Sequence, residues 1–155
     1  MIKSKIRYII ILDVIRRNGM ENYAKILKTH GIRPTIHRVQ ILKFIVESKS
    51  HPSADEIYEK LKDKIHAISR STVYNTVSLL KEKGVIEEVV TPSSIRYDYS
   101  LVPHNHFYCI KCKKVYDIYG ALGALPKITE VDGHLVKNIQ YCLYGICKNC
   151  LNGGE

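Results

Sequence analysis

Two pairs of cysteines constrain the fold of this chain more than any other feature of its sequence. Cys109 and Cys112 form one CxxC pair, Cys147 and Cys150 form a second, and 34 residues lie between the pairs. Each pair can place two thiolates on one ion from a tight turn, and two such turns complete a closed, tetrahedral, all-cysteine zinc site. Such a site would tie the C-terminal strand back to its domain and supply folding free energy.

Two disulfides or a redox-active dithiol are the alternative interpretations of the same cysteines. A redox CxxC lies at a helix N-terminus beside a βαβ pattern. Here Phe107 and Tyr108 precede the first pair, and residues 113–119 follow it as another predicted strand, which argues against a thioredoxin-like site. The fifth cysteine, Cys142, has no partner in spacing, and we expect it to be a small buried hydrophobe.

The composition favours a folded chain with a polyanionic partner. The 155 residues fit one domain or two small ones, and a hydrophobic content of 45% argues against global disorder. The chain carries 24 Lys+Arg against 15 Asp+Glu, a net charge of +9. Nucleic acid is the leading candidate partner, although charge alone does not separate it from an anionic membrane surface.

No apolar segment is long enough to cross a bilayer. The longest apolar run near the start covers residues 8–12 and is followed by Asp13, whereas a spanning helix needs about 20 apolar residues. Charged residues also interrupt any secretory signal, so we expect a cytoplasmic protein without a membrane partner. Thiols stay reduced in that compartment, which favours metal binding over disulfides.

Residues 1–19 stand apart as a basic extension. They hold five basic residues and one acidic residue, and so contribute +4 of the net charge. Met20 then opens an amphipathic helical pattern. Residues 1–19 are therefore either a leading helix that docks on the body or a stretch that precedes a true start at Met20.

Residues 20–99 are predicted to form a winged helix-turn-helix domain. After the opening helix, further helical patterns follow Thr35 and begin at Ser53 and near Ser71. Ser53 opens a capping-box pattern, and Gly84 suits the left-handed position that ends a helix.

After the helices the hydrophobic period changes to that of strands. Residues 85–90 and 95–99 are predicted to form a β-hairpin, the wing, across a turn at 91–94. Residues 100–103 are the natural hinge, and residues 104–151 are strand-rich and carry the paired cysteines. We therefore predict an α+β chain: an N-terminal winged helix-turn-helix domain followed by a small α/β domain with a four-cysteine zinc site.

The third predicted helix of the DNA-binding arrangement has an outward face suited to a major groove. Asn75 can pair with adenine through two hydrogen bonds, and Tyr74 can contact thymine methyl groups. Arg70, Lys81 and Lys83 can hold phosphates. The DNA-binding candidates are Arg70, Ser71, Thr72, Tyr74, Asn75, Ser78 and, on the wing, Arg96. The alternative is that this helix simply presents a polar face to solvent.

A second metal site is suggested by His104 and His106. Residues two apart on a strand project to the same face, so both imidazoles can bind one ion. They can also join Cys109 and Cys112 in a single mixed site, but four cysteines already satisfy zinc and leave both histidines over. We therefore prefer two sites.

Asp98, Asp117 and His51 are the candidates to complete the histidine site. Taken singly, each is as well explained as a solvated or capping residue. Together they would draw ligands from both domains, so that a metal ion fixes the angle between them. Histidines with carboxylates suit Fe(II), Mn(II) or Zn(II) rather than soft Cu(I).

Residues 21–151 resemble the ferric uptake regulator family. The resemblance rests on motifs in a fixed order: Gly31-Ile32-Arg33-Pro34-Thr35, His51-Pro52, Ala54-Asp55-Glu56-Ile57-Tyr58, Ser71-Thr72-Val73-Tyr74, the HxHxxCxxC run from His104 to Cys112, and Leu143-Tyr144-Gly145. It implies a homodimeric, metal-dependent repressor that is not an enzyme, with a C-terminal dimerisation domain and a palindromic, AT-rich operator on double-stranded DNA.

The family pattern also assigns the metal ligands. The four paired cysteines match its structural zinc, one per subunit. The positions that match its regulatory site, which takes one Fe2+ or Mn2+ per subunit, are His51, Asp98, His104, His106 and Asp117. A further family site is in doubt because Ile139 stands where a histidine is often found, and Ala124 where an acidic residue is.

Aspartates at both Asp98 and Asp117, with Asn75 after the tyrosine, resemble the peroxide-sensing branch of the family. That branch implies Fe(II)-catalysed oxidation of a ligand histidine, His51 or His104, with subsequent loss of metal and of DNA binding. The alternatives within the family are an iron-uptake or a zinc-uptake regulator that uses the metal as co-repressor. Outside it stand a zinc-containing thiol–disulfide enzyme and a zinc-ribbon nucleic-acid module.

Overall fold

The computed structural model describes residues 19–48, 50–99, 104–119, 128–137 and 139–153. The chain divides into two compact units between residues 101 and 102, and each unit is considered by itself. The predicted hinge at 100–103 and all of the basic extension except Gly19 lie outside the described residues. No helix among the described residues combines the length and the apolar character that crossing a membrane requires.

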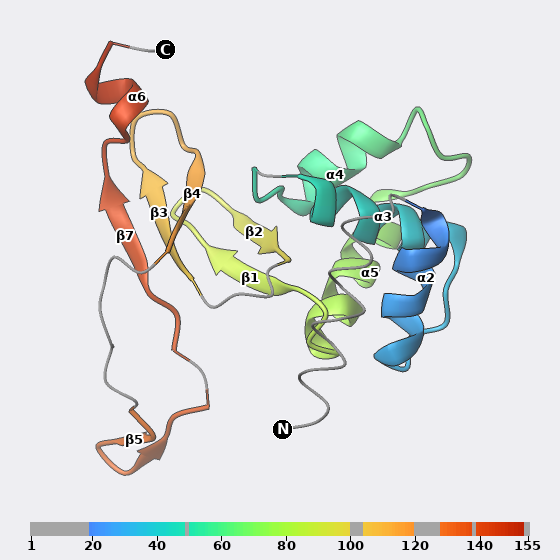
Figure 1. Cartoon of the computed structure of the whole chain (residues 1–155), viewed down its shortest axis with the longest axis horizontal. Coiled ribbons are helices and arrows are strands. Elements are labelled where there is room, and N and C mark those ends of the chain that lie inside the picture. Colours follow the sequence, from blue (N-terminus) through green and yellow to red (C-terminus); the bar gives the residue numbers. More distant parts are fainter. Residues whose placement is uncertain (1–18, 49, 100–103, 120–127, 138, 154–155) are drawn as a thin grey trace. The chain divides into compact units, whose positions relative to one another are not determined.

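The described part of the first unit contains four helices and, after them, a two-stranded hairpin (Figure 1). The elements are α2 (Met20–Thr29), α3 (Ile36–Glu47), α4 (Ala54–Leu61), α5 (Arg70–Glu82), β1 (Glu87–Val90) and β2 (Ile95–Asp98). The strands are antiparallel, with Glu87 opposite Asp98. This order confirms the predicted winged helix-turn-helix arrangement.

Local side-chain chemistry sets the helix starts. Thr35 caps α3 by accepting the backbone N–H of Arg38, and Ser53 forms the predicted capping box with Glu56 at the start of α4. Helix α5 begins slightly earlier than predicted, because Ser69 rather than Ser71 accepts the N–H that caps it.

The end of α5 explains why β1 starts later than predicted. Gly84 has φ +64° and closes the helix with its N–H on the Lys81 carbonyl, while Val85 N–H reaches back to the Leu80 carbonyl, a Schellman closure. Val85 and Ile86 are buried in the helical core. Val85 and Ile86 therefore close the helix and fill the core, and the hydrogen-bonded pairing of β1 with β2 begins only at Glu87.

The apolar faces of the helices form one core. The largest fully buried side chains of the helices include Leu27, Ile41, Leu42, Ile45, Ile57, Val73, Val77 and Leu80. Removing such side chains from water contributes about 1.5–3 kcal/mol each, so the first unit is stabilised by its own packing.

The second unit is built on a three-stranded sheet in the order β4-β3-β7. Its elements are β3 (Asn105–Cys109), β4 (Val115–Ile118), β5 (Glu130–Val131), β6 (His134–Leu135), β7 (Cys142–Gly145) and α6 (Lys148–Leu151). Strand β4 is antiparallel to β3, and β7 is parallel to it, with Cys109 opposite Gly145. This register brings the end of the chain beside the first cysteine pair.

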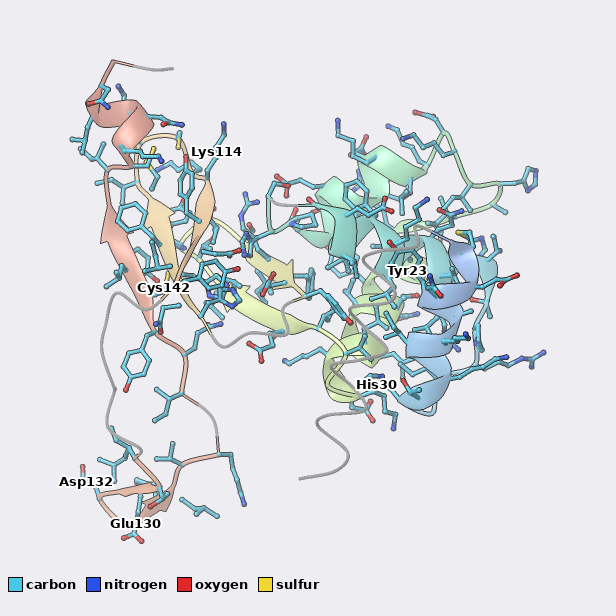
Figure 2. All side chains as sticks on the ribbon, in the orientation of Figure 1. Tyr23, His30, Lys114, Glu130, Asp132 and Cys142 are labelled. Atoms are coloured by element: carbon cyan, nitrogen blue, oxygen red, sulfur yellow. The ribbon has the colours of Figure 1, made fainter. Side chains whose placement is uncertain are left out.

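We predict that Tyr23 makes the stability of the first unit sensitive to alkaline pH. Tyr23 lies on α2 (Figure 2). Burial, together with the hydrogen bond that its hydroxyl donates to Glu47 (3.1 Å), raises the pKa of Tyr23 from 10.0 to about 12. The unfolded chain has the ordinary value, so this contribution is intact below pH 10 and is lost as the pH rises to 12. The loss amounts to at most about 3 kcal/mol, since one pKa unit is worth about 1.4 kcal/mol.

Urea unfolding monitored by far-UV circular dichroism at pH 9 and pH 11.5 tests this expectation. Tyr23→Phe, which has no proton to lose, should show a smaller fall in unfolding free energy than the wild type. An equal fall in both proteins would contradict it.

Candidate metal sites and nucleic-acid interface

The four paired cysteines converge in the second unit. Their sulfur atoms all lie within 4.8 Å of one another, with Cys109 3.9 Å from Cys150 and Cys112 3.8 Å from Cys147. Sulfurs bound tetrahedrally at 2.3 Å from zinc are about 3.8 Å apart. All five cysteines are free of disulfides, so the arrangement fits the predicted zinc site and no described pair forms the alternative disulfides.

Three backbone features hold this arrangement. Cys109 ends β3, and the chain turns back through Lys113, which has φ +63° and donates its N–H to the Cys109 carbonyl. Cys147 is the N-cap of α6 and Cys150 lies within it. The N–H groups of Cys112 and Cys147 both donate to the Cys109 sulfur, at 3.5 and 3.3 Å.

The electrostatics of the cluster favour a cation. Burial acts to raise the pKa of the Cys109 thiol, but the backbone N–H groups of Cys112 and Cys147 outweigh it and lower that pKa to about 6. The pKa of Cys147 is also lowered, chiefly by a hydrogen bond from Tyr116. Burial beside the other three sulfurs raises the pKa of Cys150 to about 12. Four thiolates can coexist here only if a bound cation offsets their charge.

The fifth cysteine differs from its prediction. Cys142 is half-buried at the start of β7 (Figure 2), and its thiol lies 3.8 Å from the Leu143 carbonyl. In the part of the chain that the structure describes, β7 pairs with β3 on one side only.

Two histidines and an aspartate meet in the same unit, apart from the cysteines. The Nε2 atoms of His104 and His106 are 3.0 Å apart, and His104 Nε2 is 3.4 Å from Asp117 Oδ1. The pairing of β3 with β4 places Asp117 directly opposite His106. Two ligands bound at right angles about 2.1 Å from one ion are about 3.0 Å apart, so this geometry suits a shared metal ion.

Tyr119 supports this group, although no sequence motif assigned it a role. Its hydroxyl donates to Asp117 Oδ2 at 3.1 Å, and its ring stacks on that of His104 with centroids 5.4 Å apart. The spacing of two between Asp117 and Tyr119 is the signal that could have found it, because both then project from one face of the strand.

His51 and Asp98 form a corresponding pair in the first unit. His51 Nε2 lies 3.5 Å from Asp98 Oδ1, and His51 is only 4% exposed. His51 has φ +50°, a conformation that costs a non-glycine residue free energy and that persists only where neighbours impose it.

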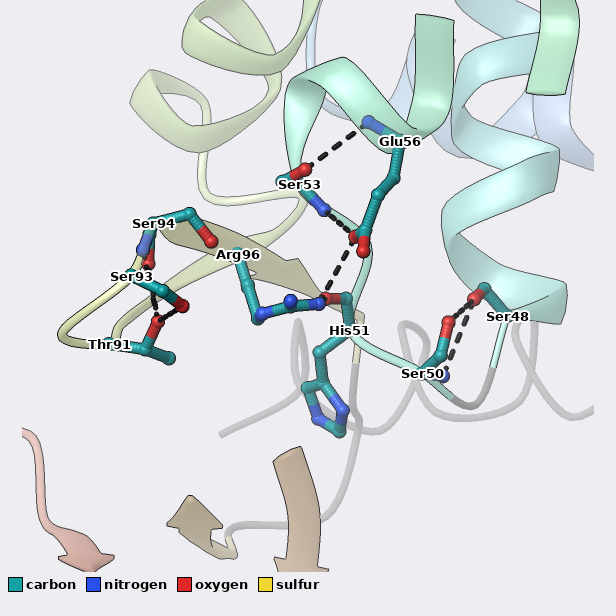
Figure 3. Close-up of polar contacts among 9 residues, drawn as sticks. All are labelled: Ser48, Ser50, His51, Ser53, Glu56, Thr91, Ser93, Ser94 and Arg96. Atoms are coloured by element: carbon teal, nitrogen blue, oxygen red, sulfur yellow. Dashed lines mark hydrogen bonds and ion pairs between the residues drawn. The ribbon is translucent and has the colours of Figure 1, made fainter. Parts of the chain in front are cut away.

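Arg96 imposes that conformation (Figure 3). Its guanidinium donates to the His51 carbonyl at 3.0 Å and pairs with Glu56 at 3.1 Å, while the backbone N–H of Tyr97 donates to the Pro52 carbonyl. Arg96 was predicted to contact DNA from the wing. Only 13% of its side chain is exposed, and the contacts that the structure shows for it hold the His51 segment.

The outward face of α5 carries the predicted DNA-binding residues. The exposed members are Arg70, Ser71, Tyr74, Asn75 and Ser78, whereas Thr72 is half-buried and shares a hydrogen bond with Ser69. The opposite face is fully buried in the core. The helix is therefore amphipathic in the sense that groove binding requires.

Helix α4 fixes two of these residues through contacts that no sequence motif predicted. Arg70 forms ion pairs with Asp55 and Glu59 and lies 4.5 Å above the Tyr58 ring. The Tyr74 hydroxyl donates to Asp55 at 3.1 Å. The carboxylate of Asp55 thus orients both an arginine and a tyrosine at the start of α5.

Comparison with known proteins agrees with these features. The model of the ferric uptake regulator family matches residues 29–141. The peroxide-responsive repressor PerR of Staphylococcus epidermidis is 33% identical over 149 residues, which cover 93% of this chain and 97% of that protein. The peroxide operon regulator of Bacillus subtilis is 35% identical over 127 residues, covering 80% and 88%.

A solved structure supports the same assignment. The ferric uptake regulator from Francisella tularensis with iron superimposes with a TM-score of 0.62 at 27% identity, covering 78% of this chain and 96% of that one. With the winged-helix order, the four-cysteine cluster and the extent of the family match, the chain belongs to the ferric uptake regulator family.

Proposed function

We propose that this protein is a metal-dependent transcriptional repressor that senses hydrogen peroxide. The observation that carries the proposal is the separation of two ligand sets within one small unit. Four sulfurs suffice for one ion, and His104, His106 and Asp117 lie together outside that set. Relatives at 33–35% identity are named as regulators that respond to peroxide.

The all-sulfur set is proposed to hold one structural Zn2+ per subunit. Zinc accepts four thiolates in a closed tetrahedron, which leaves no open position for chemistry. The metal would hold the turn after β3 to α6, and so contribute to the folding of the second unit.

The nitrogen and oxygen ligands are proposed to hold one Fe2+ or Mn2+ per subunit. In this proposal His51 and Asp98 of the first unit join His104, His106 and Asp117 of the second. An ion that takes ligands from both units restricts their relative orientation. It stabilises the DNA-binding arrangement by the difference between its binding free energies to that arrangement and to the others.

Bound Fe(II) would supply the electrons that reduce hydrogen peroxide beside the ligand imidazoles, with His51 or His104 as the site of oxidation. The chain's own residues determine the consequence of that oxidation. An oxidised imidazole is a poorer ligand, so the restraint between the units is lost. Arg96 keeps His51 in its strained position until then, because its guanidinium holds the His51 carbonyl.

The repressor is proposed to be a cytoplasmic homodimer without catalytic turnover. Helix α5 would enter the major groove of a palindromic, AT-rich operator, with Asn75 and Tyr74 at base edges and Arg70 near the phosphates. Two copies would present two such helices to the two half-sites.

An iron-uptake regulator is the second candidate, because the iron-bound structure from Francisella tularensis has the same fold at 27% identity. Such a regulator uses the metal as a co-repressor and is released from DNA when the metal is scarce. A zinc-uptake regulator would act in the same way with Zn2+ at the second site. Peroxide separates these candidates from the proposed sensor.

We expect Fe(II)-loaded protein to release operator DNA after peroxide treatment and Mn(II)-loaded protein to keep it. Loss of the metal-imposed restraint should weaken binding by about 5- to 150-fold, the range of typical allosteric coupling. Mass spectrometry of the iron form should show one added oxygen on His51 or His104. Unmodified histidines, or equal release in both metal forms, would contradict peroxide sensing.

Replacing one zinc ligand should unfold the second unit only. Cys112→Ser should lose its zinc and the dispersed NMR signals of β3, β4 and β7, while the helical signals of the first unit persist, because that unit has its own core. Cys142→Ser is the matched control and should keep one zinc per chain. Retention of zinc by the Cys112 variant would oppose the four-cysteine assignment.

Two variants of the first unit separate base reading from phosphate contact. Asn75→Ala should cost about 1–3 kcal/mol of binding free energy on the correct operator and weaken the base preference at one base pair.

Lys83→Ala should weaken binding equally on all DNA sequences and reduce the slope of log affinity against log salt concentration by about 1. Competition titrations with single-base operator variants measure both, and an Asn75 variant with unchanged preferences would remove that residue from the reading set.

A further inference from the structure

A tyrosine hydroxyl lies against the sulfur cluster. Tyr116, on β4, places its hydroxyl 3.3 Å from the Cys147 sulfur, to which it donates, and 3.9 Å from the Cys112 sulfur. Both hydrogen bonds found for this hydroxyl among the described residues are thus to sulfurs of the cluster. A phenol has only one proton to donate, and here the Cys147 sulfur accepts it, while the longer contact with the Cys112 sulfur can run in either direction.

The ring is held so that the hydroxyl cannot easily turn away. Tyr116 packs on Phe107 with centroids 6.5 Å apart, and the two rings are tilted at 55°. Phe107 in turn lies close over Gly145, where an added Cβ would be only 3.1 Å from the ring. Tyr116 is therefore built into the packing around the cysteines and is half-buried.

We propose that Tyr116 is a positioning residue of the four-cysteine site that protects its thiolates from oxidation by hydrogen peroxide. This inference rests on the proposed zinc site and peroxide exposure. A hydrogen bond to a metal-bound ligand orients it and tunes its electron density. Because the thiolate lone pair is what attacks peroxide, a donor that withdraws charge from sulfur slows that attack.

The reaction that Tyr116 opposes has a definite balance. One thiolate attacks the O–O bond, which gives a sulfenic acid and a hydroxide ion. A second thiolate then displaces hydroxide from that sulfur and forms a disulfide. Overall, two thiolates and one hydrogen peroxide give one disulfide and two hydroxide ions, and the zinc ion loses two ligands. A sensor whose oxidation occurs at histidine must keep this competing reaction slow.

The protection has a physical basis at both sulfurs. Cys112 and Cys147 come from different CxxC pairs and lie 3.8 Å apart, close enough to form a disulfide after modest movement. They are also the two sulfurs that the Tyr116 hydroxyl contacts. The hydroxyl thus lies beside the two sulfurs whose oxidation to a disulfide would remove one zinc ligand from each CxxC pair.

The test is the rate of zinc release by full-length zinc-loaded protein with Mn(II) at the other site. Mn(II) removes iron chemistry, so peroxide acts on the thiolates alone. A chromogenic chelator reports the zinc released, and intact mass reports the disulfide. Tyr116→Phe should release zinc about threefold to tenfold faster than the wild type. Its zinc affinity in a chelator competition should be about 10-fold lower, the lower end of such effects.

Tyr144→Phe is the matched control. Tyr144 lies in the same sheet on β7 and packs on Tyr108, and no hydrogen bond joins its hydroxyl to the four-cysteine set among the described residues. This variant should behave as the wild type. Equal zinc release by the Tyr116 variant and the wild type would overturn the proposal.

A second substitution separates a hydrogen-bond effect from a loss of packing. 3-Fluorotyrosine at position 116 keeps the ring and makes the hydroxyl a stronger donor, so zinc release should become slower than in the wild type. Faster release with fluorotyrosine would also overturn the proposal. All of these comparisons use the Mn(II) form. A failure of iron-dependent histidine oxidation would therefore contradict the proposed function but would leave the proposed role of Tyr116 untouched.

Discussion

The convergence of four thiolates is the constraint on which the second unit depends. Among its described residues, this unit has few buried apolar side chains, chiefly Tyr108 and Val115, beside the cysteines themselves. Large apolar residues such as Leu135, Tyr144 and Leu151 remain exposed. So small a core supplies little hydrophobic free energy, and a metal ion held by Cys109 and the other three cysteines would add to it. The first unit, with a continuous helical core, has no such need.

The same constraint positions the second ligand set. Strand β3 carries His106 near its start and Cys109 at its end. Its pairing with β7 fixes the cysteine pairs, and its pairing with β4 places Asp117 opposite His106. The four-cysteine cluster at one end of the strand and the histidine–aspartate group at the other are therefore held by the same strand pairings. The histidine–aspartate group thus lies on the same rigid strand as the cysteine cluster, and the two groups share no ligand.

Local signals in the sequence predicted much of this arrangement. The capping box at Ser53, the closing Gly84 and the CxxC spacing each act over a few residues, so they could be identified without a structure. Other contacts join residues that are far apart in the sequence. They are the hydrogen bonds from Arg96 to the His51 carbonyl, from Tyr74 to Asp55 and from Tyr116 to Cys147. No periodicity encodes such contacts. Cys142 was expected to be buried because free cysteines usually are. It lies on β7, which pairs with β3 alone among the described strands, and it is half-buried.

X-ray absorption at two edges tests the central claim, that two ions are held by two chemically distinct ligand sets. Protein loaded with Zn2+ and Mn2+ should show four sulfur neighbours at about 2.3 Å from zinc. At the manganese edge it should show nitrogen and oxygen neighbours without sulfur. A zinc spectrum with mixed sulfur and nitrogen neighbours would mean that His104 and His106 share an ion with the cysteines, and would contradict the account.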